Sequence, residues 1–506
     1  MEKTVPELMA AISPEDWEQV PVSVMKLIEE LVRRMDKLEQ SMAALQTENE
    51  QLKEQLARTS KNSSQPPSKN PLTFKPNRKK PTGKKRGGQI GHQGYERKLY
   101  PTEKCLEVIE HYPQQCGKCG SEQMSSSTPP YRHQVVEIPP VEPIVTEHQF
   151  FSMTCNCCGQ ENQAPSISQI ISQGGYGTRV AAMVGLFSSQ YRQSYRQIQN
   201  IMVAVFGIEM SLGSINRLRC EVSESVSDAV AEAMGYMQQQ PTVSIDETGF
   251  KQRNGDVWSG HPPSCQNAIK TSGWLWVAVT PLIIYFQVIL SRGAAAAQTV
   301  LGSAFSGFII SDRCPAYNWV DVANRLVCWA HLKRDFIQIS ERVGASAEIG
   351  ESLLAQEKIV FNLWHQFRNK QLNRSELIQA VEPIQAKVLA ILLEAAELQI
   401  GEHEKTPLAK TVRTCRNLLK LFDSLWLFVR EEGVEPTNNA AERAIRPAVI
   451  WRRTSFGSNS ATGSEFVSRL LTVVSSLKAQ ERNILDFLAE SVSAARSGAI
   501  PPSLLP

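Results

Sequence analysis

Residues 242–246 read Thr-Val-Ser-Ile-Asp, and residues 307–312 read Gly-Phe-Ile-Ile-Ser-Asp. Each stretch is a short apolar run rich in β-branched or aromatic side chains, which favours a buried strand. Each run ends on an aspartate, Asp246 in the first and Asp312 in the second. Between them, residues 274–280 and 282–290 predict two more strands and residues 294–303 predict a helix. The two aspartates are therefore expected at the ends of the first and fourth strands of one sheet.

A fifth strand is predicted at residues 326–331, followed by a helix that starts near Lys333. Three strands, a helix, a strand, and then a strand and helix is the order of a ribonuclease-H-like mixed sheet, so we predict an α/β catalytic domain over residues 237–455. In that fold the first and fourth strands lie side by side, which would bring Asp246 and Asp312 within reach of shared metal ions. The long helical stretch at about 342–432 is predicted to be an insertion.

A third oxygen ligand is supplied after the predicted insertion. Residues 437–443 read Thr-Asn-Asn-Ala-Ala-Glu-Arg, which places Glu442 on a helix that Asn438 or Asn439 could cap. Carboxylate oxygens suit Mg²⁺ or Mn²⁺, and two such ions activate the attacking oxygen and stabilise the leaving one in a phosphoryl displacement. A single aspartate at a strand end is more often a turn or cap residue, so the prediction depends on the order of the whole set.

Two further residues near this set have open roles. His331 follows the predicted fifth strand and could position DNA, support a ligand or be an ordinary core histidine. Arg443, next to Glu442, could bind a DNA phosphate or pair with a carboxylate. The predicted metal-binding and catalytic residues therefore remain Asp246, Asp312 and Glu442.

Helices are predicted on both sides of the catalytic domain. In the segment 166–236, residues 195–206 are amphipathic, Gly207 ends that helix and Ser211 could cap a second one. This helix-turn-helix outline fits a DNA-binding element, but it also occurs in helical bundles that never touch DNA. Residues 456–506 are predicted to form a helical C-terminal segment.

Six of the 11 cysteines lie between Cys105 and Cys158. Two pairs end in glycine, Cys116-Gly-Lys-Cys119-Gly and Cys155-Asn-Cys157-Cys158-Gly, which is the knuckle pattern of a tetrahedral zinc site. We therefore predict a zinc-binding domain at residues 101–165 with structural Zn²⁺ on Cys116, Cys119, Cys155 and Cys158. The 35 residues between the pairs exceed the usual spacing, so three other side chains could replace a cysteine: His111, His133 and His148. Buried free thiols are the alternative, and Cys157 is an extra thiol.

The segment 59–100 is basic and rich in helix-breaking residues. Residues 61–98 hold 11 Lys and Arg against a single acid, Glu96. Such a segment cannot bury enough apolar surface to fold alone, and its charge favours phosphate contacts. We predict a flexible DNA-binding arm, the alternative being a solvated linker. The DNA contacts are assigned to Lys79, Lys80, Lys84, Lys85 and Arg86.

Residues 1–58 contain a heptad repeat. One seam position holds Ile28, Met35, Met42, Asn49 and Leu56, and the other holds Leu31, Leu38, Leu45 and Leu52. Leucine at one position and a single Asn at the other are typical of a two-stranded parallel coiled coil. A helix packed on its own domain is the alternative, although the other faces are almost wholly polar. We predict a homo-oligomer, at least a dimer.

The overall composition is that of a soluble multidomain chain. It has 506 residues, 42% hydrophobic residues and a formal net charge of +3. The longest apolar run, residues 281–290, is about half the length of a membrane span, and no secretory signal is visible. We predict a cytoplasmic protein with no membrane contact.

Several blocks carry a family resemblance: Ser-Ile-Asp-Glu-Thr at 244–248, Ser-Asp-Arg at 311–313, Cys-Trp-Ala-His-Leu-Lys-Arg at 328–334, and Asn-Asn-Ala-Ala-Glu-Arg-Ala-Ile-Arg-Pro at 438–447. With the zipper, the basic arm and the cysteine pairs, they resemble the insertion-sequence sixty-six transposase family. Two features depart from the family pattern: Ala440 stands where a Gln is expected, and the block at 451–458 is divergent.

The resemblance implies a DD(E/D) DNA transposase in which Asp246, Asp312 and Glu442 bind the metal ions. Metal-bound water would hydrolyse the end of the element, and the freed 3′-hydroxyl would attack target DNA. Accessory transposition proteins are the further partners that the resemblance suggests. The alternatives are a non-catalytic zinc-dependent DNA-binding regulator and a related nuclease of the same fold. Inverted terminal repeats flanking the gene would favour transposition.

Overall fold

The computed structural model describes residues 20–63, 70–71, 74, 87, 91–94, 97–123, 125, 129–164, 175–252 and 271–506. Within this part, the main sheet has five strands in the order β5-β4-β3-β6-β7. They span Ile284–Ile289 (β5), Thr271–Val279 (β4), Thr242–Gln252 (β3), Phe308–Ser311 (β6) and Arg325–Val327 (β7). β3 is antiparallel to β4 and parallel to β6, so the first and fourth strands of the sheet are neighbours, as their order along the chain predicted.

β3 is the central strand, and it is longer than its apolar run suggests. Val243 and Ile245 are fully buried, which explains why this stretch forms the middle of the sheet. The strand does not end at Asp246, because its pairing with β4 continues to Gln252, which lies opposite Thr271. Asp246 therefore lies within β3, and the prediction of a strand ending on it was wrong.

The fifth strand is shorter than predicted. β7 ends at Val327, opposite Ser311 of β6, and helix α10 (Trp329–Ser340) begins two residues later. His331 consequently lies in the first turn of α10 instead of closing a strand. From this position on α10, the His331 side chain lies 3.7 Å from the carboxylate of Glu442.

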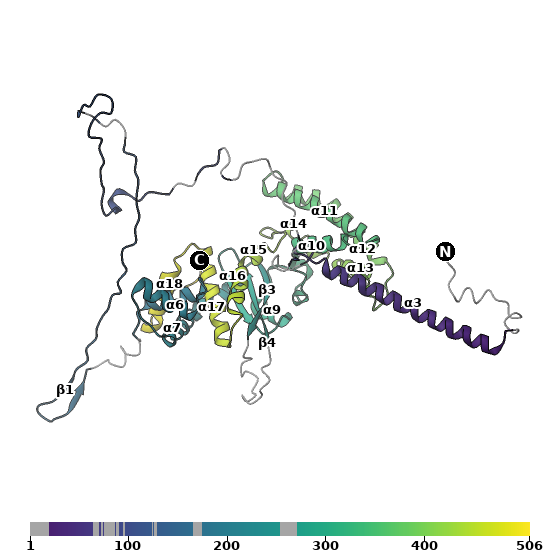
Figure 1. Ribbon diagram of the computed structural model, residues 1–506, viewed down its shortest axis with the longest axis horizontal. Coiled ribbons are helices and arrows are strands. Elements are labelled where there is room, and N and C mark those ends of the chain that lie inside the picture. The colour runs from purple at the N-terminus through teal and green to yellow at the C-terminus, as the bar shows by residue number, and fades with distance from the viewer. Residues whose placement is uncertain are drawn as a thin grey trace.

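Two groups of helices flank the sheet (Figure 1). One group packs with β3, β4 and β5 in a single core that contains Trp276 and Phe286. It comprises α5 (Thr178–Ser189), α6 (Tyr195–Phe206), α7 (Leu212–Ser225), α8 (Ser227–Gln238), α9 (Ala294–Leu301), α15 (Asn439–Ala444), α16 (Arg446–Ser455), α17 (Ala461–Ala479) and α18 (Ile484–Ser497). The predicted helix 195–206 is confirmed, with Gly207 in the left-handed region (φ 63°) ending it and Ser211 capping α7.

The second group lies within residues 342–432, where a helical insertion is predicted. It consists of α11 (Ala345–Arg368), α12 (Arg374–Glu397), α13 (Pro407–Lys420) and α14 (Leu427–Arg430). These helices share a core with α10, β6 and β7 that is centred on Trp329 and Trp426, whose rings lie 5.1 Å apart edge to face. Single turns of 3-10 helix occur at Thr102–Lys104 (η2), Pro315–Tyr317 (η4), Val322–Asn324 (η5) and Asp423–Leu425 (η6).

Helix α17 covers the β5 edge of the sheet. The backbone N–H groups of Ile284, Phe286 and Val288 on β5 donate to hydroxyl oxygens of α17 at 2.9–3.0 Å. The acceptors are Ser476, Thr472 and Ser468, spaced four residues apart along one face of α17. The helix thereby satisfies donors that an edge strand normally leaves open.

The N-terminal helix α3 (Val22–Leu56) ends against the insertion (Figure 1). Glu54 accepts from Arg342 (2.8 Å) and pairs with Lys410 on α13. The leucines of the predicted zipper are exposed, with 69% of Leu38 and 64% of Leu45 accessible in the single chain. α3 is thus a long helix whose apolar seam is uncovered.

The cysteine-rich segment is largely irregular. A short antiparallel pair, β1 (Ser152–Thr154) and β2 (Glu161–Gln163), flanks the second cysteine knuckle. Within the described ranges, none of the helices combines the length and the apolar character that a membrane span requires.

Candidate functional site

The parallel register of β3 and β6 brings the two predicted aspartates together. Ser244 on β3 lies opposite Ile310 on β6. Asp246 and Asp312 each follow two residues later, so they stand at the same level of neighbouring strands. Asp312 comes directly after β6, where its side chain turns back to accept the backbone N–H of Cys314 at 2.8 Å.

Three other carboxyl groups lie close enough to Asp246 to affect its ionisation. Burial, reinforced by the charges of Glu247, Asp312 and Glu442, raises the pKa of Asp246 to about 8. Glu442 therefore lies close enough to interact with Asp246 although it is almost 200 residues further along the chain. This concentration of negative charge is typical of a site built to hold cations.

Helix α15 is docked by Asn438, which is fully buried. The side-chain amide of Asn438 donates to the carbonyl oxygen of Ile245 at 2.8 Å, next to Asp246 on β3. Its backbone N–H donates to Sγ of Cys328 at 3.1 Å. The sequence predicted that Asn438 or Asn439 would cap this helix, but no side chain does so. Asn438 serves as a tertiary link that places Glu442 beside the sheet.

Glu442 itself is three-quarters buried and incompletely partnered. Its Oε1 lies 3.7 Å from Nδ1 of His331 and 3.8 Å from Nη2 of Arg334, both on α10. Neither Oε1 of Glu442 nor Nδ1 of His331 has a hydrogen bond within the described residues. Because buried polar atoms without partners are costly, the arrangement suits a bound ligand.

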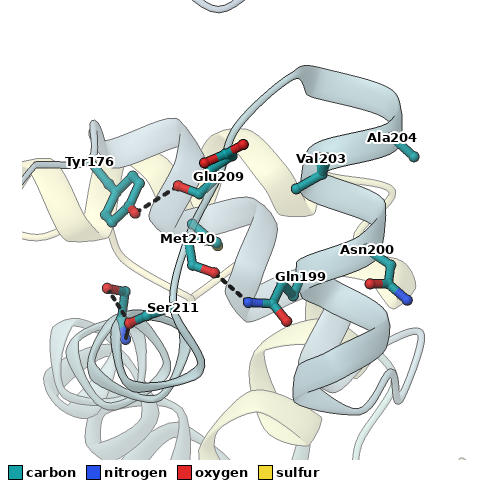
Figure 2. A pocket seen from close by; sticks show the side chains of 9 residues that line it. Tyr176, Gln199, Asn200, Val203, Ala204, Glu209, Met210 and Ser211 are labelled. Carbon is teal, nitrogen blue, oxygen red and sulfur yellow. Dashed lines mark hydrogen bonds between the residues drawn. The ribbon is translucent and has the colours of Figure 1, made fainter.

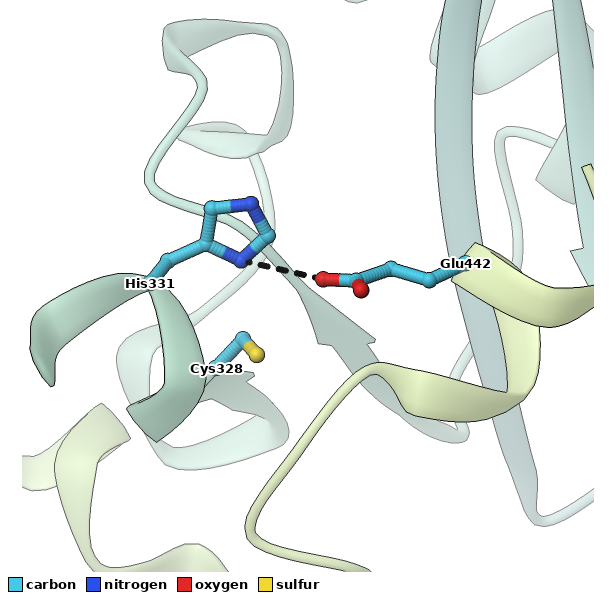
Figure 3. A group of neighbouring side chains, drawn as sticks. All are labelled: Cys328, His331 and Glu442. Atoms are coloured by element: carbon cyan, nitrogen blue, oxygen red, sulfur yellow. Dashed lines mark ion pairs between the residues drawn. The ribbon is translucent and has the colours of Figure 1, made fainter. Parts of the chain in front are cut away.

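Cys328, His331 and Glu442 form a compact group (Figure 3). Their ligand atoms lie within 4.8 Å of one another, and no other set of three or more His, Cys, Asp or Glu side chains in the described part of the chain meets that limit. Cys328 was not singled out from the sequence. Its position three residues before His331 was the available signal.

Two other residues near the acidic site were also missed. Glu247 is buried and accepts hydrogen bonds from Tyr317 (2.5 Å) and Arg292 (2.9 Å). Arg325, 1% exposed, donates to the backbone carbonyl of Asp312 at 2.8 Å and so holds the loop that carries this aspartate. Neither contact has a sequence signature, because each partner lies on a different element.

The two cysteine knuckles are formed separately. In each, the first cysteine's carbonyl accepts from the glycine N–H, Gly120 in one and Gly159 in the other, at 2.8–2.9 Å. Both glycines adopt positive φ, 72° and 74°. Backbone N–H groups lower the pKa of the Cys116 thiol and of the Cys155 thiol. Each knuckle is thus shaped for a metal-bound thiolate.

The structure does not, however, gather the four predicted zinc ligands into one cluster. Cys116, Cys119, Cys155 and Cys158 all lie in the described part, yet no three of them meet the distance limit that Cys328, His331 and Glu442 satisfy. The same holds for Cys157 and for His111, His133 and His148, the alternative ligands. The donor set within each knuckle fits zinc, and the joining of the two knuckles remains a prediction.

Of the six predicted DNA-contacting residues, only Arg443 lies within the described part of the chain. Lys79, Lys80, Lys84, Lys85 and Arg86 lie outside the described residues, and Arg443 is exposed on α15.

A surface hollow lies where α6 turns into α7 (Figure 2). Tyr176 donates to Glu209 O and Gln199 donates to Met210 O, which fixes this turn. The hollow contains none of the predicted carboxylates.

The fold and the acidic site define a mixed α/β protein with a carboxylate-lined centre on its sheet. Comparison with family models is more specific. The model described as "Transposase IS66 family" matches residues 175–466, and "zinc-finger binding domain of transposase IS66" matches residues 113–159. The chain belongs to the IS66 transposase family and carries its zinc-finger domain. Residues 17–98 match a family of unknown function.

Two curated relatives come from Sinorhizobium fredii (strain NBRC 101917 / NGR234). "Uncharacterized protein y4qI" is 26% identical over 248 residues, covering 45% of this chain and 44% of the relative. "Uncharacterized protein y4hP" is 22% identical over 415 residues, covering 76% of this chain and 71% of the relative. The chain thus spans less than half of the first relative and about 70% of the second.

Proposed function

We propose that this protein is the DNA transposase of an insertion sequence, with a ribonuclease-H-like catalytic domain of the DD(E/D) type. The observation that carries the proposal is electrostatic: together with burial and Glu247, the charges of Asp312 and Glu442 raise the pKa of Asp246 to about 8. In the metal-free protein the ligand atoms of Asp246, Asp312 and Glu442 do not all lie within 4.8 Å of one another. The strand order β5-β4-β3-β6-β7 supports the fold assignment, and the family match supports the reaction class.

The donor set fits Mg²⁺ or Mn²⁺, because it consists of carboxylates and includes an Oε1 atom of Glu442 that lacks a hydrogen bond. When bound, two such ions would activate the attacking oxygen and stabilise the leaving oxygen of a phosphodiester. Asp246 interacts with both other carboxylates and would therefore be the ligand that the two ions share. Asp312 and Glu442 would complete it from β6 and α15.

The remaining parts of the chain would bind and pair the DNA ends. Arg443, which is exposed beside Glu442, would contact a phosphate near the site. The basic arm at 59–100 and the zinc-finger domain would hold the element ends, and pairing of α3 would bring two such ends together. The proposed active form is thus a homodimer bound to DNA.

The proposal is tested by in vitro cleavage and joining of the element's own ends with Mg²⁺. Asp246→Asn, Asp312→Asn and Glu442→Gln should each lower the joining rate at least about a hundredfold, since a lost metal contact costs several kcal/mol in the transition state. End binding, measured by gel shift, should remain. The matched control is Glu435→Gln, an exposed carboxylate seven residues before Glu442.

Near-normal joining by any one of the three variants would remove that residue from the set. End binding without joining in the wild-type protein would favour a non-catalytic DNA-binding regulator. Cleavage of branched DNA or RNA–DNA hybrids without joining would favour a related nuclease.

A further inference from the structure

The group formed by Cys328, His331 and Glu442 has the spacing of a metal site. Tetrahedral zinc with bonds of about 2.0–2.3 Å keeps neighbouring ligand atoms about 3.3–3.8 Å apart. Nδ1 of His331 and Oε1 of Glu442 already lie 3.7 Å apart, and a ligand atom from each of Cys328, His331 and Glu442 lies within 4.8 Å of the other two. A shift of about 1 Å or less would complete the triangle.

These three side chains are fixed from two directions (Figure 3). Cys328 immediately precedes α10, and His331 lies in its first turn, so both project from one end of that helix. Glu442 comes from α15, which is tied to Cys328 by the backbone N–H of Asn438. The N–H of Trp329 also donates to Pro436 O at 2.9 Å. The cluster therefore sits at a rigid junction of two segments.

The unsatisfied atoms in this cluster point to a ligand. Nδ1 of His331 and Oε1 of Glu442 are buried and lack hydrogen bonds among the described residues. A simple ion pair at 3.7 Å would leave both atoms without a proper hydrogen bond, whereas a cation between them would satisfy both.

The chemistry of the donors selects the kind of cation. Mg²⁺ and Mn²⁺ prefer oxygen ligands and rarely accept a thiolate, whereas sulfur and imidazole together favour Zn²⁺ or Co²⁺. On binding, the Cys328 thiol would release its proton to solvent and bind as the thiolate.

We propose that Cys328, His331 and Glu442 form a second site, for a thiophilic divalent cation of the Zn²⁺ type, with its fourth position open. Glu442 then belongs to two alternative ligand sets. With Asp246 and Asp312 it forms an all-oxygen set, called the hard set, and with Cys328 and His331 it forms a set containing sulfur and nitrogen, called the soft set. Zn²⁺ in the soft set withdraws Glu442 from the hard set and inhibits the reaction. This inhibitory consequence rests on the proposed function, whereas the binding site itself does not.

The site is tested by Co²⁺ titration of the full-length protein, purified with its cysteine knuckles loaded with zinc. Wild type should bind about one added equivalent and develop a thiolate-to-cobalt charge-transfer band in the near ultraviolet. Cys328→Ser should lose the band, and His331→Gln should weaken Co²⁺ binding at least tenfold. The matched control is Cys415→Ser, a buried thiol in the insertion core, which should keep the band.

His331→Gln is an independent second variant in case Cys328→Ser misfolds, because 17% of the His331 side chain is exposed whereas Cys328 is fully buried. A band of equal strength in Cys328→Ser would mean that cobalt enters the knuckles, and the proposal would fail. The absence of a band in wild type would overturn it as well.

The inhibitory role is read separately in the joining assay. For each variant, the joining rate with added Zn²⁺ is divided by its own rate without Zn²⁺ at fixed Mg²⁺. Zinc should inhibit wild type and Cys415→Ser at least tenfold more strongly than Cys328→Ser. Equal inhibition of all three would overturn the shared use of Glu442. A cobalt band in a protein that joins no DNA would leave the site standing and reject the proposed function.

Discussion

At the scale of single residues, Asp246 is the carboxyl group of the site whose ionisation is most strongly disfavoured by burial and by neighbouring negative charges. Its carboxyl group is buried among those of Glu247, Asp312 and Glu442, which raises its pKa to about 8. The unfolded chain releases the same proton near 3.8, the ordinary value. Between these two pH values the folded state holds a proton that the unfolded state lacks, so raising the pH destabilises the metal-free protein.

Asp246→Asn should therefore stabilise the metal-free protein, by about 1–3 kcal/mol at pH 8 and by little at pH 4. Thermal unfolding in EDTA across this pH range measures the effect, and added Mg²⁺ should raise the melting temperature of wild type only. Asp228→Asn, an exposed carboxylate on α8, is the control. Parallel pH profiles for wild type and Asp246→Asn would contradict the assignment of charge repulsion to this residue.

Asn438 is the residue that joins α15 to the sheet. Asn438→Ala removes the buried hydrogen bond to Ile245 O, which should cost about 1–3 kcal/mol of stability. It should also slow joining, because Glu442 loses its anchor. The neighbouring exposed Asn439→Ala provides the control, with an expected change within about 0.5 kcal/mol. Urea unfolding and the joining rate are the two measurements.

At the scale of elements, the hydroxyl row of α17 explains why so polar a helix face is buried. Ser464, Ser468, Thr472 and Ser476 are all less than 9% exposed, which is unusual for side chains of this type. Three of them accept the edge N–H groups of β5, and Ser464 donates to Gln252 at the end of β3. The helix thus acts in place of a further strand.

Thr472→Val tests this role because valine keeps the shape of threonine and removes its hydroxyl. The N–H of Phe286 then loses its acceptor, and the free energy of unfolding should fall by about 1–3 kcal/mol. Ser475→Ala on the same helix, where the side chain is partly exposed, should change it by less than about 0.5 kcal/mol. Equal effects in chemical denaturation would show that the hydroxyl row does not stabilise the edge.

At the scale of the whole molecule, we propose that α3 pairs with α3 of a second chain and so links two catalytic domains. The C-terminal end of α3 is held on the insertion by Glu54, while the leucine seam remains exposed. Pairing through that seam would place two catalytic domains at a defined separation, as the joining of two element ends requires.

Replacing Leu38 and Leu45 together by Glu should therefore give a monomer, because charges at the seam of a coiled coil repel across the pair. Light scattering after size exclusion should show half the wild-type mass. Gln40→Glu with Ala44→Glu adds the same charge away from the seam and should leave the dimer intact. A dimer in both variants would assign self-association to another surface.

Much of the architecture could be predicted because it depends on local patterns. Apolar runs marked all five strands of the main sheet, and Gly207 and Ser211 marked the turn between α6 and α7. The strand order placed Asp246 and Asp312 on neighbouring strands. Boundaries were less certain, since β3 is lengthened by pairing with β4 and the run predicted as the fifth strand divides into β7 and the start of α10.

The amino-acid pattern by itself determined the elements, the heptad seam, the two knuckles and the three candidate carboxylates, because periodicity and turn chemistry act between near neighbours. Only the tertiary structure decided that Asn438 docks α15, that Cys328 and His331 share Glu442, and that α17 closes the sheet edge. Those contacts join segments roughly 110 to 190 residues apart. Tertiary packing determines these contacts, because local sequence patterns do not specify which distant residue a side chain will meet.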